Sequence, residues 1–150
     1  MDYSSPHKIS VLEYIIIGAI IVVIGVVSVW AVSSTRSHSR DVVRMANMKE
    51  VYYGLELYFD ALNDYPKGSA LVLGGPNAGS LDEKGFHSRG SCSGRVFLPM
   101  IAENPTPKGA PFVYNFNPGP PSSYQTTFSL EGGAGGLAAG KHSMTPTGLQ

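Results

Sequence analysis

Two hydrophobic patterns follow one another in the first half of the chain. Residues 14–32 carry no charged side chain and consist mainly of isoleucine, valine, alanine and glycine. This run of about nineteen residues is close to the ~20 that a helix needs to cross the hydrocarbon core of a membrane. We therefore predict a transmembrane helix over residues 14–32.

The second pattern, over residues 36–62, is that of an amphipathic helix. Apolar side chains recur there at spacings of three and four, and they are Met45, Met48, Tyr52, Leu55, Phe59 and Leu62. One face of such a helix must be covered, so we expect Met48, Tyr52, Leu55, Phe59 and Leu62 to pack on the rest of the protein. Asn63 tolerates the left-handed cap conformation, and Pro66 cannot continue a helix. We assign one long helix to residues 9–65, and its regular part, which ends at Leu62, would be about 80 Å long.

The remaining residues, 66–150, are predicted to form a β-rich head. Most of the chain's 18 glycines and 11 prolines lie there, which favours short strands joined by turns. Alternating apolar positions predict strands over residues 112–116 and 124–130, with a hairpin loop between them. Residues 141–145 are expected to form a last edge strand, and residues 67–95 a glycine- and serine-rich connection. The predicted fold class is α+β, with a small antiparallel sheet packed on the second half of the helix.

Residues 1–8 form a short polar leader before the apolar run. One interpretation is the positively charged start of a secretory signal, with Ile15–Val27 as its apolar region. Against it stand the length of the apolar run and a helical pattern that continues past any cleavage point near Ala31.

Three residues near the start of the helix are candidates for subunit assembly, namely Glu13, Gly18 and Gly25. Ser10 and Glu13 have the spacing of a capping box, in which each side chain binds amides of the first turn. A carboxylate at the edge of a bilayer is also costly unless it is paired, so Glu13 could bind a positive group on a neighbouring copy. Gly18 and Gly25 lie on one side of the helix and would allow another helix to approach closely. The alternative for these glycines is that glycine is common in membrane helices.

Charge excludes one class of partner and gives evidence on orientation. Eleven basic and eleven acidic residues cancel, so we expect no nucleic acid partner. Four basic residues follow the apolar run, and the positive-inside rule taken alone places the head in the cytoplasm. These residues are Arg36, His38, Arg40 and Arg44. A solvated face is expected for the arginines, with only a weak surface pair between Asp41 and Arg44.

Motifs for catalysis, cofactors and metals are not recognisable. The four histidines lack metal-ligand spacing, and Cys92 is the single cysteine. Residues 90–94 (GSCSG) lack the strand-then-helix setting of a nucleophile elbow. Asp82, Glu83 and Glu131 could offer oxygen ligands to calcium, but solvated carboxylates are the preferred interpretation. We expect no enzymatic activity, no cofactor and no metal.

Several segments together resemble a known family. Residues 40–44 (RDVVR), 48–59 (MKEVYYGLELYF) and 64–66 (DYP) resemble the part of type IV pilin-like proteins and type II secretion major pseudopilins that joins the membrane helix to the head. Residues 104–107 (NPTP), the aromatic hairpin and the segment from Phe128 to Gly148 are similar to the C-terminal half of pilin-like proteins.

The resemblance implies a structural subunit of a pilus or pseudopilus filament. The precursor would lie in the inner membrane with an extracytoplasmic head, and the filament in the periplasm or at the cell surface. A prepilin peptidase would cut between Lys8 and Ile9, where the family has glycine in place of Lys8, and the new N-terminus would be methylated. Glu13 matches the family's glutamate, which pairs with the freed amine of a neighbouring subunit. The implied partners are further copies of the chain and a pilus or secretion assembly machinery.

A second hypothesis is a single-pass membrane-anchored protein whose head binds a ligand or partner and never polymerises. Lys8 at the cleavage position and the arginines after the apolar run favour this alternative.

Overall fold

The computed structural model describes residues 10–107 and 109–150, and it has an α+β fold. A single long helix, α1 (Val11–Leu62), precedes all the strands of the described residues. The strands are β1 (Leu71–Val72), β2 (Ser80–Asp82), β3 (Gly85–His87), β4 (Val96–Leu98), β5 (Val113–Asn117), β6 (Ser123–Leu130), β7 (Gly140–Thr145) and β8 (Gly148–Leu149). The chain divides between Arg36 and Ser37 into two compact units, close to the point where the hydrophobic pattern changes.

Both ends of α1 have the caps that the sequence predicts. The Ser10 hydroxyl accepts a bond from the Glu13 amide at 3.3 Å, and the Glu13 carboxylate accepts one from the Ser10 amide. At the other end, Asn63 has a φ of 54°, and its amide donates to the Phe59 carbonyl at 2.7 Å. The left-handed residue satisfies a carbonyl that the last helical turn leaves unpaired.

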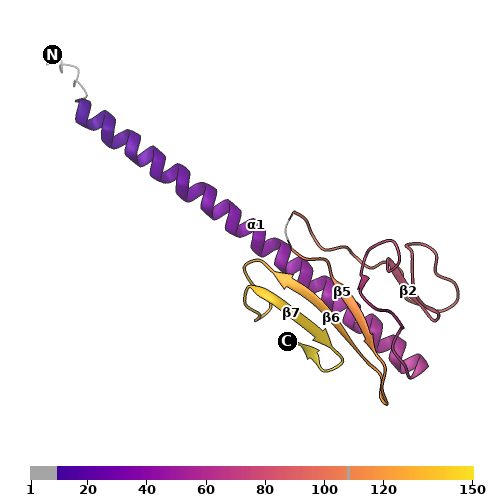
Figure 1. Ribbon diagram of the computed structural model, residues 1–150. Helices are drawn as coiled ribbons and strands as arrows, with labels where there is room; N and C mark the ends of the chain where they lie inside the picture. Colours follow the sequence, from indigo (N-terminus) through magenta and orange to yellow (C-terminus); the bar gives the residue numbers. More distant parts are fainter. Residues whose placement is uncertain (1–9, 108) are drawn as a thin grey trace, which may run out of the picture. The chain divides into compact units, whose positions relative to one another are not determined.

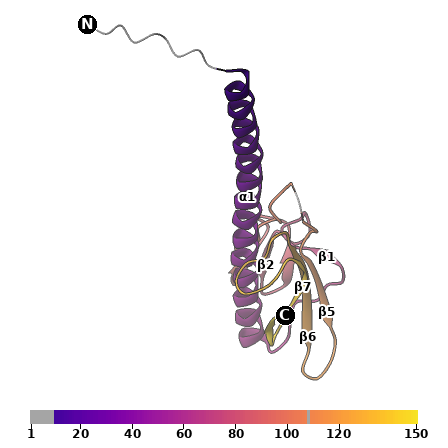
Figure 2. The ribbon, with the colours of Figure 1, turned by 90° about the vertical axis from the view of Figure 1, so that its left-hand side faces the viewer.

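The main sheet of the second unit is antiparallel, with the strand order β1-β5-β6-β7-β8. Strands β5 and β6 form the predicted hairpin, with Asn117 opposite Ser123 at its closed end. Figures 1 and 2 show β5, β6 and β7 lying along the C-terminal part of α1. The strand predicted over residues 141–145 is confirmed as β7, but its predicted place at the edge of the sheet is wrong, because β8 pairs with β7 on its outer side.

A second sheet has the order β3-β2-β4, and it corrects the prediction for residues 67–95. That segment is not only a connection, because β1, β2 and β3 all lie in it. Each has two or three residues, which is too short for an alternating pattern to be visible. The tight turn between Asp82 and Gly85, which pair across β2 and β3, supports the small sheet.

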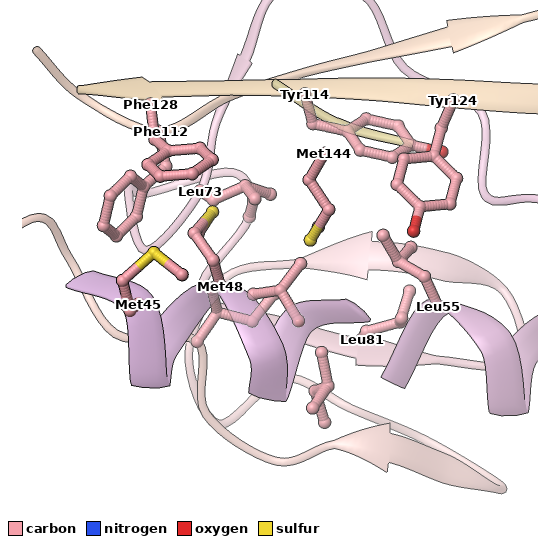
Figure 3. Packing of buried hydrophobic residues seen from close by; sticks show 14 of the residues in the cluster. Met45, Met48, Leu55, Leu73, Leu81, Phe112, Tyr114, Tyr124, Phe128 and Met144 are labelled. Atoms are coloured by element: carbon pink, nitrogen blue, oxygen red, sulfur yellow. The ribbon is translucent and has the colours of Figure 1, made fainter. Parts of the chain in front are cut away.

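The core lies between α1 and the main sheet, and loops and the small sheet close it. Figure 3 shows Met45, Met48 and Leu55 of α1 facing aromatic side chains from the strands. The members from the strands and loops include Leu73, Leu81, Leu98, Ile101, Phe112, Tyr114, Tyr124, Phe128 and Met144, all at most 5 % exposed. The head therefore uses the second half of α1 as one wall of its core.

The packed face of α1 differs in part from the predicted one. Met48 and Leu55 are fully buried, and Tyr52 and Phe59 are partly buried against the core. Leu62 is 44 % exposed, so the prediction that it packs on the head is wrong. It is the last helical residue, and the packing ends one turn earlier. The buried face also includes Asp41, Arg44, Val51, Gly54 and Tyr58, which the predicted stripe omits.

Candidate assembly helix and an ion-pair network

The first unit presents an apolar helical surface that no described residue covers. All the large apolar side chains of residues 11–32 are between 49 % and 77 % exposed. By length and composition this part of α1 is able to cross a membrane. An uncovered apolar surface of this size marks a site for lipid or for another protein.

Two hydroxyl groups of the first unit are satisfied inside the helix. The Ser28 hydroxyl donates to the Ile24 carbonyl at 2.7 Å, and the Thr35 hydroxyl donates to the Ala31 carbonyl at 2.9 Å. Because these hydroxyls donate to the preceding turn, they need no water as a partner. Polar groups in an apolar surround must be satisfied in this way.

The residues predicted for assembly lie on this segment. Glu13 caps α1 as described above, and its pairing with a neighbouring copy stays a prediction. A Cβ added to Gly18 or Gly25 would meet no described atom within 4 Å, so both glycines are open to a second helix. Lys8 and Ile9, the predicted cleavage position, lie outside the described residues.

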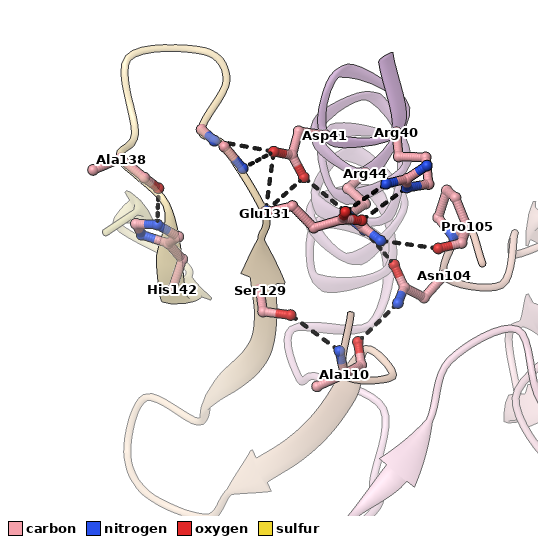
Figure 4. Close-up of polar contacts among 12 residues, drawn as sticks. Arg40, Asp41, Arg44, Asn104, Pro105, Ala110, Ser129, Glu131, Ala138 and His142 are labelled. Carbon is pink, nitrogen blue, oxygen red and sulfur yellow. Dashed lines mark hydrogen bonds and ion pairs between the residues drawn. The ribbon is translucent and has the colours of Figure 1, made fainter. Parts of the chain in front are cut away.

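A buried network lies in the second unit, where α1 enters the head. The Asp41 carboxylate is fully buried and accepts bonds from the amides of Glu131, Gly132 and Gly133 at 2.7–3.0 Å. These amides begin the glycine-rich loop that follows β6 (Figure 4). Asp41 therefore holds that loop against the helix.

Arg44 binds a second loop from the same helical turn. Its side chain is fully buried, and it pairs with Asp41 at 2.7 Å and with Glu131 at 2.8 Å. The same guanidinium donates to the Asn104 side chain at 2.7 Å and to the Pro105 carbonyl at 2.9 Å. Figure 4 shows Arg44 between these two loops, so one arginine joins three separate segments.

Arg40 completes the network and makes it electrically neutral. Its Nε donates to Glu131 Oε1 at 2.8 Å, and its other contact is an ion pair with the second oxygen of the same carboxylate. This is the two-point geometry that arginine and a carboxylate favour. The charges of Arg40 and Arg44 cancel those of Asp41 and Glu131.

The network lowers the pKa of both carboxylates. Burial alone would raise the pKa of Asp41, but the amides of Glu131 and Gly132 and the Arg44 guanidinium hold it below its ordinary value. The hydrogen bond from Arg40, against a smaller opposing effect of burial and with help from Arg44, lowers the pKa of Glu131 to about 2. Both carboxylates are therefore ionised at neutral pH.

These contacts overturn two predictions. The pair between Asp41 and Arg44 is not a weak surface pair, because both side chains are completely buried. Glu131 is not a solvated carboxylate, because it binds two arginines and is only 13 % exposed. The short spacing of Asp41 and Arg44 was visible in the sequence, but no local signal placed Glu131 beside them.

Asp82 is also buried, which corrects its predicted solvation. It accepts bonds from the amides of Lys84 at 2.8 Å and Ser93 at 2.7 Å, and it lies 2.9 Å from His87 Nε2. These bonds outweigh the effect of burial and lower the pKa of Asp82. Through the Ser93 amide, Asp82 thus holds the loop that contains Cys92.

An open groove of about 460 Å³ lies on the main sheet. Its lining includes Pro111 before β5, Phe128 on β6, and Lys141 and His142 on β7. Among residues 10–107 and 109–150, no group of three histidine, cysteine, aspartate or glutamate side chains is placed to hold a metal ion.

Comparison of the chain with known protein families, with curated proteins and with solved structures found no match.

Proposed function

We propose that this protein is a structural subunit of a filament of the type IV pilus or type II secretion pseudopilus kind. One observation supports the proposal most. A single helix carries an uncovered apolar surface over its first part and provides a wall of the head's core over its second part. The same helix would anchor the precursor in the inner membrane and join the subunits in the filament.

The physical step of assembly is an exchange of apolar surroundings. The side chains of residues 14–32 need lipid or protein around them, and the same segment of other copies supplies such a surface. Gly18 and Gly25 let helices approach closely. The Glu13 carboxylate would lose its aqueous surround in the filament, so it needs a positive partner such as the amine of a cleaved neighbour.

The proposal places the head outside the cytoplasm and makes the protein non-enzymatic. A prepilin peptidase would remove residues 1–8 before assembly, and the machinery of a pilus or secretion system would extract the subunit from the membrane. The protein then acts through its copies rather than through a catalytic site.

Glu13→Ala tests the assembly role of the carboxylate. In a bacterial host that carries a prepilin peptidase and a pilus or type II secretion system, the variant should enter the membrane normally and give far fewer filaments. Membrane fractionation and electron microscopy of sheared filaments measure the two effects. Ser10→Ala is the matched control, because it removes the other half of the cap and keeps the carboxylate. Filament yields equal to the unchanged protein for Glu13→Ala would contradict the pairing role.

The second candidate is a membrane-anchored binding protein that does not polymerise. The groove beside Phe128, Lys141 and His142 favours it, because a concave surface with apolar groups and one lysine ammonium can hold a ligand. This candidate predicts that residues 1–8 stay on the mature protein and that no filament forms.

A further inference from the structure

The apolar segment of α1 carries one aromatic residue near each of its ends. Tyr14 is 63 % exposed and Trp30 is 73 % exposed, and the residues between them are aliphatic or small. At 1.5 Å per residue, the two positions are about 24 Å apart along the helix. Tyrosine and tryptophan side chains concentrate at the two surfaces of a bilayer, where one end of the ring is apolar and the other meets water.

We propose that Tyr14 and Trp30 lie at opposite interfaces of the bilayer and so fix the depth of α1 in the membrane. The inference rests on the membrane anchoring of the proposed function and adds the position of the helix along the membrane normal. Its partner is the lipid headgroup region.

The polar groups of the segment agree with this depth. Between Tyr14 and Trp30 the only polar side chain is Ser28, and its hydroxyl is bonded to the Ile24 carbonyl. A hydroxyl that is satisfied inside the helix can lie in hydrocarbon at low cost. The charge-free stretch ends only at Arg36, after Ser33, Ser34 and Thr35.

The depth has a consequence for Glu13. This residue directly precedes Tyr14, so its carboxylate would lie in the headgroup region, where water and the Ser10 amide solvate it. The inserted monomer then holds no charge in the hydrocarbon core. The need of Glu13 for a positive partner would arise only on assembly, when the segment leaves the lipid.

Fluorescence quenching measures this depth directly, because Trp30 is the single tryptophan of the chain. The full chain would be reconstituted in phosphatidylcholine and phosphatidylglycerol vesicles that carry a quencher either near the headgroup or near the end of the acyl chain. We expect a greater loss of Trp30 emission with the headgroup quencher, and an emission maximum shifted to shorter wavelength than in water. An equal or greater loss with the acyl-end quencher would overturn the proposal.

Two variants calibrate the result. Val23→Trp in a Trp30→Phe background places the indole at the middle of the segment, and the acyl-end quencher should then act more strongly. Tyr14→Trp in the same background should repeat the shallow pattern of Trp30. If no quencher acts on any of the three proteins, membrane insertion itself fails and the proposal falls with it. A shallow pattern together with absent filaments would leave the depth standing and contradict only the filament.

Discussion

At the scale of single residues, the network at Asp41 and Glu131 shows how one helical turn organises the head. Asp41 binds three successive amides of one loop, and Arg44 binds the loop at Asn104. Buried ions of this kind are costly unless every charge is paired and hydrogen-bonded. Here the two arginines and two carboxylates satisfy one another, so the network holds the two loops in one arrangement.

The lowered pKa of Glu131 gives the head a defined dependence on acid. In the unfolded chain Glu131 binds a proton near its ordinary pKa of 4.5, but in the folded head it does so only near 2. Its ionic contribution to stability is therefore complete above pH 4.5 and is lost as the pH falls from 4.5 towards 2. The pKa values of Asp41 and Asp82 are also lowered, so their ionic contributions to stability are likewise lost as the pH falls.

Glu131→Gln should lower stability at neutral pH and flatten its decline between pH 4.5 and 2. Urea unfolding of the full chain in detergent, followed by the near-ultraviolet circular dichroism of the head, measures the free energy at each pH. Glu103→Gln, which removes an exposed carboxylate outside the network, is the control. An equally steep decline in Glu131→Gln would show that this carboxylate is not held by Arg40 and Arg44 in solution.

The residue scale also shows what local patterns cannot give. Met48 and Leu55 were predicted to pack because the apolar face of an amphipathic helix must be covered. Asp41 and Glu131 are about ninety positions apart, and the energy of their contact depends on burial that only the folded chain creates. Charged residues were therefore assigned to the surface, where most of them lie.

At the scale of elements, long regular patterns were predicted well and short elements were missed. The length of the helix and strands β5 and β6 follow from spacings that repeat several times, and the helix end at Leu62 follows from Asn63 and Pro66. Strands β1 to β4 and β8 have two or three residues each, so their pairing depends on turns and on the neighbouring strands rather than on a repeat.

The contact between α1 and β4 depends on the absence of a side chain at Gly54. A Cβ at that position would lie 2.3 Å from the Leu98 side chain. Gly54→Ala should therefore destabilise the head by about 1–3 kcal/mol, even though alanine is the better helix former. Urea unfolding of the detergent-solubilised chain measures the change.

A second substitution distinguishes this clash from other effects of Gly54→Ala. Adding Leu98→Ala removes the atoms that the new Cβ would meet, so the double variant should lose less stability than the sum of the two single variants. Gly18→Ala, where the added Cβ meets no described atom, should leave the unfolding of the head unchanged. Strict additivity of Gly54→Ala and Leu98→Ala would contradict the close approach.

At the scale of the whole molecule, the sequence predicted an α+β chain with one long apolar helix, and the structure confirms it. The filament stays a proposal, because assembly depends on other copies and on machinery outside the chain. The orientation of the chain in the membrane also stays a proposal. Arg36, His38, Arg40 and Arg44 favour a cytoplasmic head by the positive-inside rule, whereas the proposed filament requires an extracytoplasmic one.

Cys92 gives a direct test of orientation, because it is the single cysteine and its side chain is partly exposed. In intact spheroplasts, a maleimide that cannot cross membranes should label Cys92 to the same extent as after lysis. Cys92→Ser provides the background signal. Labelling that appears only after lysis would place the head in the cytoplasm and contradict the filament.

The most direct test of the central claim is the mass of the mature protein. In a host with a prepilin peptidase, the account predicts a chain that begins at Ile9 and carries an N-terminal methyl group, and it predicts this form in sheared filaments. Intact-protein mass spectrometry of membrane and filament fractions measures it. A chain that keeps residues 1–8 in every fraction would contradict the account.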